Sequence, residues 1–286
     1  RAEVRGLRVT GSELVGLIPL EAMLTAGRHF LRKQKRSTGV SEKELIKIAI
    51  RSLGLNDLCK FKPEEKIIEY KLAEKNRPKL IDRTVLDFCN ETSSESLVPA
   101  GGSVCACLGS LGAALGTMVA NVSAHKRGWE ERWKEFSDWA EKGMALQTEL
   151  TSLIDEDAES YSNLLTTKKL PESTHKEKEN KRQAVQEAIK NAVLVPYRII
   201  ETVWQVLDVI EAMVEEGIPS AVADGAVAAL AARSSAKGAL INMRVNVKQL
   251  EDQAFVEDIL NKGSEMERDV VKKEESILQK MEKRVF

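Results

Sequence analysis

One acidic residue in the stretch LIDEDAESYSNLL, residues 153–165, is out of place in the helix that this stretch predicts. Successive helical residues turn by about 100°, and on this basis Asp157 lies in the middle of an apolar stripe. A carboxylate among apolar side chains has a raised pKa and can exchange protons near neutral pH. Asp157 is therefore either a functional carboxylate or a buried residue that caps a neighbouring helix. The stripe within roughly 40° of it contains Leu146, Leu150, Leu153, Tyr161 and Leu164, and the acids pointing into the polar sector are Asp155, Glu156 and Glu159.

The segment PAGGSV, residues 99–104, places a pair of glycines at the predicted start of a helix. Free backbone N–H groups and the helix dipole at such a start suit an anion or the polar head of a ligand. Gly101, Gly102 and Ser103 are therefore candidates for substrate binding. The alternative is a plain N-terminal turn without a ligand.

Further polar residues occur in segments that are otherwise apolar. Asn242 and Asn246 in INMRVNV are four residues apart and share a helical face, whereas Arg244 faces elsewhere. Such groups are costly to bury unless they bind something. Lys126 in AHKRGW can hold a carboxylate or be an ordinary surface lysine. Asp224 in PSAVADGAV can be a site residue, an N-cap or a partner in a buried hydrogen bond.

The elements that must position these residues are helical from residue 81 onward. Small-residue helices are predicted near residues 103–122 and 220–240, and small side chains allow their backbones to approach closely. A long amphipathic helix is predicted from roughly residue 127 to 165, and a later helix contains Pro196, where we expect a kink. This pattern predicts a mainly α protein, an all-α helical bundle.

Residues 1–72 have a different pattern, which predicts a short α+β segment. Strands are indicated by LRVTGSELVGLIP and IIEYKL. Between them, one helix is predicted after Pro19 and a second from an N-cap at Ser41 to Gly54. The charged, proline-containing stretch AEKNRPKL marks a linker at residues 73–80, so residues 81–286 form a separate domain.

Composition excludes several classes of function. The net charge of −1 argues against nucleic-acid binding, for which a basic excess is expected. The four cysteines lack metal-ligand spacing, and without a visible signal peptide we expect a reducing, cytoplasmic location. The uncharged run from Ser96 to His125 has the length of a membrane span, but its many small residues favour a buried helix and no membrane span.

Several of these segments together resemble one protein family. Residues 79–260 resemble the formiminotetrahydrofolate cyclodeaminase and methenyltetrahydrofolate cyclohydrolase family. They contain, in the same order as that family, the motifs PAGGSV, MVANVSAHK, DEDAESY, VLVPYRIIETV and SAVADGAVAALAARSSAKGALINMRVNV. The front of the chain, with VTGSELVGLIPLEAML and GLNDLCKFKPEEKIIEY, is similar to the C-terminal end of a formiminotransferase domain. Two positions depart from the family pattern: Ala100 interrupts the usual glycine run, and Ala223 stands where a serine is common.

The resemblance implies a helical bundle of the cyclodeaminase/cyclohydrolase type. It also implies the closure of 5-formiminotetrahydrofolate to 5,10-methenyltetrahydrofolate with release of ammonia. Because the substrate supplies both reacting groups, the enzyme has to move protons, and this is the role that the resemblance implies for Asp157. The folate substrate carries an anionic glutamate tail, which we expect Lys126 and Arg244 to contact. No metal or nucleotide motif is visible in the sequence, so we expect no metal and no cofactor. The further candidates for substrate binding are Gly101, Gly102, Ser103, Asp224, Asn242 and Asn246.

Other functions stay open on the sequence. The same fold can act as a methenyltetrahydrofolate cyclohydrolase, in which water attacks and no ammonia leaves. It can also serve as a non-catalytic helical scaffold or oligomerisation module. We expect no formiminotransferase activity, because residues 1–72 correspond only to the end of that domain. We also expect a homodimer or higher homo-oligomer, because the small-residue helices have too many apolar positions for one thin bundle to cover.

Overall fold

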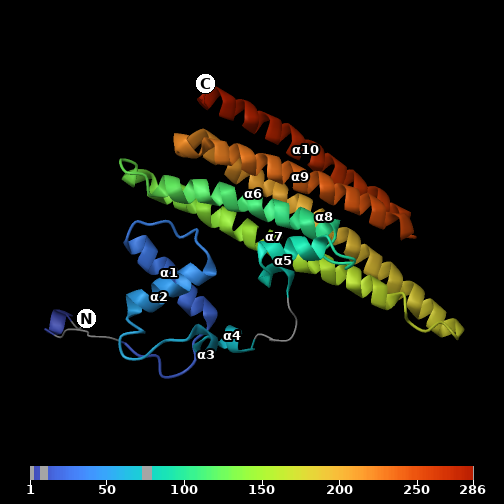
Figure 1. The fold of residues 1–286 in the computed structure, drawn as a ribbon, viewed down its shortest axis with the longest axis horizontal. Coiled ribbons are helices and arrows are strands. Elements are labelled where there is room, and N and C mark those ends of the chain that lie inside the picture. Colours follow the sequence, from blue (N-terminus) through green and yellow to red (C-terminus); the bar gives the residue numbers. More distant parts are fainter. Residues whose placement is uncertain (1–2, 7–11, 73–78, 286) are drawn as a thin grey trace.

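Long helices built from the small-residue and amphipathic segments dominate the computed structural model, which describes residues 3–6, 12–72 and 79–285. The helices are α1 (Leu20–Lys33), α2 (Glu42–Leu53), α3 (Pro63–Lys66), α4 (Ile68–Leu72), α5 (Val85–Thr92), α6 (Gly101–Ala124), α7 (Trp133–Thr167), α8 (His175–Glu216), α9 (Val222–Asn246) and α10 (Gln253–Val285). Figure 1 shows α6–α10 as an elongated bundle, with α1–α4 as a smaller group at one side. The predicted all-α bundle is confirmed.

The helices α6 and α9 approach each other closely in antiparallel directions. A Cβ atom at Gly112 of α6 would lie 3.0 Å from the carbonyl oxygen of Ala228 in α9, so any larger residue there would press against the α9 backbone. Gly101, at the start of α6, lies beside Asn242 near the end of α9. Within the described residues, α6 alone is long and apolar enough to pass for a membrane span. It packs against α7, α8 and α9, which is the position of a core helix.

The amphipathic helix α7 presents the predicted stripe to the bundle core. Leu150 and Leu153 are fully buried, and Leu146 and Leu164 are nearly so. The assignment of Tyr161 to this stripe is wrong, because 37% of the residue is exposed. Tyr161 lies about 40° from the centre of the stripe, at its edge, where the neighbouring helices no longer cover the side chain.

Residues 12–72 form a unit with its own apolar core, made of buried side chains between Met23 and Ile67. Its helix α2 begins and ends as predicted: the Ser41 side chain accepts the Glu44 N–H at 3.3 Å, and Gly54 adopts a φ of 66°.

The strand predicted for IIEYKL is wrong, because its residues Ile68–Leu72 form α4. A strand needs a partner along its length, and in this part of the chain Ile67 forms only a single bridge with Ile18. Residues 7–11 of the other predicted strand lie outside the described residues, as do residues 73–78 of the predicted linker. The described residues 12–19 of that segment form no strand beyond the bridge at Ile18, so the predicted α+β character of the front is wrong for the described residues.

The connection between α1 and α2 joins this unit to the bundle. The Asn121 side chain of α6 donates a hydrogen bond to the Gly39 carbonyl at 2.8 Å, and the Ser37 N–H donates to Nε2 of His125 at 3.3 Å. Thr38 is buried and hydrogen-bonds to α7. The front unit therefore contacts α6 close to its C-terminal end.

Candidate active site

The carboxylate of Asp157 lies against the start of α6. The Ser103 hydroxyl donates a hydrogen bond to Asp157 Oδ2 at 2.9 Å, and the Ser103 backbone N–H also donates to this carboxylate. The start of α6 needs such an acceptor, because its N-cap residue Ala100 provides no side-chain hydrogen bond. Asp157 therefore caps α6 from a neighbouring helix, which is one of the two roles that its sequence position allows.

Burial raises the pKa of Asp157 above its ordinary value, and the hydrogen bonds from Ser103 offset only part of this rise. The carboxyl group therefore gains and loses its proton closer to neutral pH than an exposed aspartate does. Capping and proton exchange are compatible in one group, because an Asp157 that is partly protonated still offers an acceptor oxygen to the backbone.

The glycine pair at the start of α6 makes room for two polar side chains. A Cβ atom at Gly102 would lie 2.0 Å from Asp157 Oδ1, which is far inside any possible contact distance. A Cβ atom at Gly101 would lie 3.3 Å from the amide atoms of Asn242. In the first turn of α6, the Asp157 carboxylate therefore lies against Gly102 and the Asn242 amide lies against Gly101.

The amide of Asn242 is held in place by groups that the sequence analysis did not select. Its Nδ2 donates to the carbonyl oxygen of Gly238 at 3.1 Å and lies 4.0 Å from Cys105 Sγ. Burial, with a contribution from the charge of Asp157, raises the pKa of the Cys105 thiol to about 11, so this thiol stays protonated at neutral pH. The spacing of one helical turn between Gly238 and Asn242 is the signal that could have indicated Gly238.

We refer to Gly101, Gly102, Ser103, Asp157 and Asn242 as the carboxylate site. It combines the N-terminus of a helix, a carboxylate with a raised pKa and an oriented amide. Such a set can bind the polar part of a ligand and move a proton on it. The side chain of Ser103 is completely buried, so its expected contact with substrate is corrected to a contact with Asp157.

Two of the predicted site residues on α9 are placed differently from Asn242. Asn246 shares its helical face, as expected, but its Nδ2 donates to the carbonyl oxygen of Ala192 at 2.7 Å and so joins α9 to α8. Arg244 is exposed, and its direction differs from that of Asn242 by about 160° around the helix. Asn246 thus holds helices together, and Arg244 lies outside the carboxylate site.

Lys126 and Asp224, two further candidates for substrate binding, lie far from the carboxylate site. The Ile218 N–H donates to Ser123 Oγ at 2.9 Å, which places the start of α9 beside the end of α6. Lys126 follows the end of α6, with its Nζ 4.1 Å from the centre of the Trp129 ring, and Asp224 lies in the first turn of α9. Since the 24 residues of α6 rise by about 36 Å, both are at the opposite end of the bundle.

The three acids outside the stripe of α7 differ from one another. Glu159 is exposed, as predicted, and Glu156 forms an ion pair with Arg198 at 2.6 Å. Asp155 is not a solvated side chain, because its Oδ1 accepts the Leu80 N–H at 2.6 Å and its Oδ2 is buried. The short turn that begins at Leu80 covers this side of α7, and helical periodicity alone does not predict that cover.

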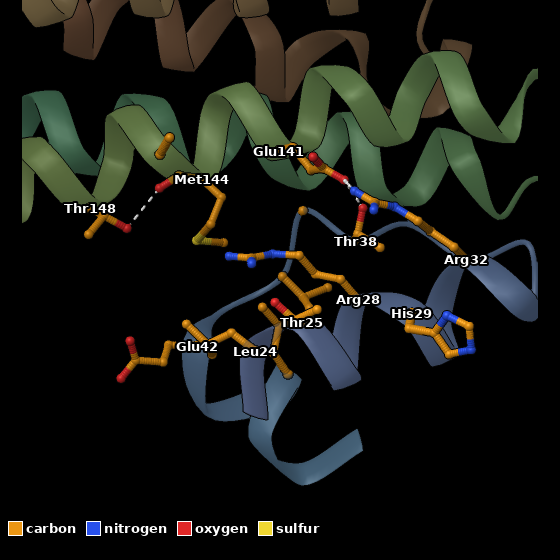
Figure 2. Close-up of a pocket in the computed structure, with 14 residues that line it drawn as sticks. Leu24, Thr25, Arg28, His29, Arg32, Thr38, Glu42, Glu141, Met144 and Thr148 are labelled. Atoms are coloured by element: carbon orange, nitrogen blue, oxygen red, sulfur yellow. Dashed lines mark hydrogen bonds and ion pairs between the residues drawn. The ribbon is translucent and has the colours of Figure 1, made fainter. Parts of the chain in front are cut away.

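Two of the larger clefts in the described part of the chain lie elsewhere. One, of about 840 Å³, separates α1 from α7, and Figure 2 shows Arg28 extending across it toward Met144. Arg32 lies at its edge and pairs with Glu141 at 3.2 Å. The other, of about 1130 Å³, follows α7 and α8 beside residues 79–98. Asp157 lines neither cleft, so the carboxylate site is separate from both.

Comparison with known families covers both parts of the chain. The model of the formiminotransferase-cyclodeaminase family matches residues 84–265, which include the whole carboxylate site. The chain belongs to the formiminotransferase-cyclodeaminase family. The model of the formiminotransferase domain matches residues 1–73.

Two relatives of this formiminotransferase-cyclodeaminase family member have the names of enzymes that act on folates. It is 34% identical over 257 residues to a formimidoyltransferase-cyclodeaminase of Rattus norvegicus, covering 90% of this chain and 47% of that protein. It is 32% identical over 179 residues to a methenyltetrahydrofolate cyclohydrolase of Methylorubrum extorquens, covering 63% of this chain and 86% of that protein. The chain spans about half the length of the formimidoyltransferase-cyclodeaminases that it matches.

A solved structure supports the fold of the bundle. The formiminotetrahydrofolate cyclodeaminase of Thermotoga maritima superposes with a TM-score of 0.63 at 24% sequence identity. The superposition covers 71% of this chain and 98% of the Thermotoga chain. The helical bundle is therefore the fold of a known family structure.

Proposed function

We propose that this chain is a formiminotetrahydrofolate cyclodeaminase, which converts 5-formiminotetrahydrofolate to 5,10-methenyltetrahydrofolate and ammonia. The observation that carries the proposal is the carboxylate of Asp157, held at the start of α6 with a pKa that burial raises. The match of residues 84–265 to the formiminotransferase-cyclodeaminase family supports it.

The reaction requires one proton to move between two nitrogens of the substrate. The formimino group enters as a protonated amidine on N5, and N10 attacks its carbon. Asp157 as a carboxylate accepts the proton that N10 loses, and as a carboxylic acid it returns this proton to the nitrogen that leaves as ammonia. Because both nitrogens belong to one molecule, the substrate itself supplies their proximity.

The remaining residues of the carboxylate site suit the polar atoms of a folate. The first turn of α6 offers backbone N–H groups, and the amide of Asn242 lies beside Gly101. We assign the glutamate tail of a folate, including a polyglutamate, to the exposed Arg244, and no cofactor is required by this chemistry. An increase in KM larger than the loss of kcat in Arg244→Gln would support the tail contact, and an effect on kcat alone would contradict it.

The test of the activity is a turnover assay on this chain. Supplied with 5-formiminotetrahydrofolate, it should produce methenyltetrahydrofolate, followed by absorbance, and one ammonia for each molecule converted. A folded protein that gives neither product would contradict the proposal and favour the non-catalytic scaffold.

The second candidate function is hydrolysis of methenyltetrahydrofolate. The Methylorubrum relative, a methenyltetrahydrofolate cyclohydrolase matched over 86% of its length, is the observation that favours it. In that reaction Asp157 would take the proton from an attacking water instead of from N10. Formation of formyltetrahydrofolate from methenyltetrahydrofolate, without turnover of the formimino substrate, would select this candidate.

We also infer that the chain forms a homo-oligomer through the outer face of α6 and α9. Four apolar side chains on α9 point within about 60° of one another, and Leu111 of α6 is exposed as well. Apolar patches of this kind mark protein–protein contacts, and self-association is the commonest form of such contact. The exposed side chains of α9 on this face are Val227, Leu230, Ile241 and Val245.

We assign residues 1–72 to the end of a formiminotransferase domain and residues 81–286 to the cyclodeaminase domain. The family match of residues 1–73 supports the first assignment. We also propose a cytoplasmic location, which suits the four free cysteines and which cell fractionation tests. A role in histidine degradation is part of the same proposal.

A further inference from the structure

The hydroxyl group of Ser103 lies within hydrogen-bonding distance of two different acceptors. Its Oγ is 2.9 Å from Asp157 Oδ2 and 3.0 Å from the carbonyl oxygen of Ile154. A serine hydroxyl has one hydrogen and two lone pairs, so it donates fully to only one acceptor at a time. Because the Ser103 side chain is completely buried, bulk water does not compete for this hydrogen.

The two protonation states of Asp157 make opposite demands on this hydroxyl. An ionised carboxylate only accepts hydrogen bonds, whereas a carboxylic acid also donates one. A fixed donor to Oδ2 would favour the ionised state, and a proton on that same oxygen would then face another hydrogen. A buried polar hydrogen without an acceptor costs free energy, so a fixed donor would oppose one half of a proton-transfer cycle.

Ser103 can satisfy both states without moving its oxygen atom. When Asp157 is ionised, the Ser103 hydrogen points to Oδ2. When Oδ2 carries a proton, that proton is donated to a lone pair of Ser103 Oγ, and the Ser103 hydrogen turns to the Ile154 carbonyl. A helical carbonyl retains a second lone pair for such a bond. Only the hydroxyl hydrogen rotates between the two arrangements.

We propose that Ser103 is a positioning residue whose hydroxyl reverses its hydrogen bond each time Asp157 gains or loses a proton. The proposal rests on the proposed cyclodeaminase function, because a group that cycles between two protonation states requires both arrangements. It assigns to Ser103 a role in proton transfer without contact to the substrate, consistent with its burial.

The direct test is an NMR titration of the intact protein carrying ¹³C-labelled serine and aspartate, with signals assigned through Ser103→Ala and Asp157→Asn. In the wild type, the Ser103 signal should titrate with the same midpoint as the Asp157 carboxyl signal, and Asp157→Asn should abolish the serine titration. A Ser103 signal that does not change with pH would mean that the hydroxyl stays bonded to Ile154, and it would overturn the proposal.

The same titration separates a reversing hydroxyl from a fixed donor. Loss of a hydrogen bond made only to the charged form should raise the midpoint of Asp157 by about 1 unit or more. If the hydroxyl instead bonds to both forms, its removal in Ser103→Ala should shift the Asp157 midpoint by less than about half a unit. A full rise in the midpoint would contradict the reversal even where the two signals titrate together.

Turnover supplies a further readout. Ser103→Ala should lower kcat about 10-fold across the whole pH range, which corresponds to the loss of about one hydrogen bond, and should shift its pH midpoint by less than about half a unit. The matched control is Ser235→Ala, because Ser235 is also completely buried and its hydroxyl donates to the Cys105 carbonyl at 2.7 Å. If the wild type has no turnover, the proposed function fails, whereas the NMR titration still decides whether the hydroxyl reverses.

Discussion

Asp157 on α7 accepts hydrogen bonds from both the side chain and the backbone of Ser103 on α6, so one carboxylate joins two helices and caps one of them. The atoms that fix the helix start are the atoms to which we assign the proton transfer. Substitutions at this position therefore have to separate loss of chemistry from loss of structure. An amide is the suitable replacement, because asparagine also caps helices.

Asp157→Asn should abolish most of the turnover while keeping the fold. The amide cannot exchange a proton, so kcat should fall by about 10²–10⁴ with little change in KM. Kinetics with the formimino substrate and circular dichroism check this. Glu159→Gln is the control, because Glu159 is exposed on the same helix, and it should be within about 0.5 kcal/mol of the wild type in stability. Normal turnover by Asp157→Asn would refute the assignment.

The stability difference between the wild type and Asp157→Asn should depend on pH. Burial raises the folded-state pKa of Asp157 above that of the unfolded chain, so the folded protein binds the extra proton between the two values. The contribution of Asp157 to the free energy of unfolding therefore falls as pH rises through this window. In thermal unfolding from pH 3 to 8, the stability of Asp157→Asn relative to the wild type should increase with pH. The opposite trend would mean that the hydrogen bonds outweigh burial.

Gly102→Ala should damage the site more than Gly101→Ala. The new methyl group at residue 102 would lie 2.0 Å from Asp157 Oδ1, whereas the methyl group at residue 101 would meet the Asn242 amide at 3.3 Å. We expect Gly102→Ala to cost about 1–3 kcal/mol of stability and to remove turnover, because the carboxylate has to move. Denaturant unfolding and kinetics of the two variants provide the comparison. Equal effects of the two changes would argue against close contact at residue 102.

Acidic pH should weaken the attachment of the front unit to α6. Partial burial, and then the charge of Arg36, lower the pKa of His125, whose Nε2 accepts the Ser37 N–H and must be neutral to do so. Because the folded pKa is below the unfolded value of about 6.5, this stabilisation is present above that value and is lost as pH falls toward the folded pKa.

His125→Gln should reduce the pH dependence of this attachment, because an amide oxygen can accept the same hydrogen bond without titrating in this range. Limited proteolysis between pH 5 and 8, with cleavage near the linker as the readout, measures the effect. His29→Gln, which changes an exposed histidine of α1, is the control. An unchanged pH profile in His125→Gln would exclude His125 as the group responsible.

Leu230→Lys should shift the protein toward the monomer. This side chain is 47% exposed on the outer face of α9, and a charge there would be buried in a homo-oligomer. Light scattering should give a multiple of 31.7 kDa for the wild type and a smaller mass for the variant. Val85→Lys is the control, since Val85 is also exposed but lies on α5. A wild-type mass of one chain at micromolar concentration would contradict self-association.

Periodicity predicted the parts of the fold that depend on one helix at a time. The four leucines of the apolar stripe beside Asp157 and the caps of α2 at Ser41 and Gly54 follow from local spacing and were found as predicted, whereas Tyr161 was not. The segment Ile68–Leu72 was misassigned because a short apolar run fits a strand or a helix equally well. Only its contacts decide between the two.

The composition of the site depended on contacts between helices, which spacing does not contain. Spacing contains no information on which ends of α6 and α9 meet, so it did not predict that Lys126 lies about 36 Å from the start of α6. Asp155 was assigned to solvent because the cover provided by Leu80 comes from a distant segment. Asn242 was selected correctly as a polar group in an apolar run, but its bond to Gly238 required the structure.

The two ends of α6 hold different partners: Asn121 and His125 bind the front unit, and Ser103 binds Asp157. An α-helix resists compression along its axis, because every backbone hydrogen bond would have to change length together. The front unit also holds α7, because the Thr38 N–H donates to Ser137 of that helix. The helices α6 and α7 are in this respect two stiff connections between one domain boundary and the pair Ser103 and Asp157.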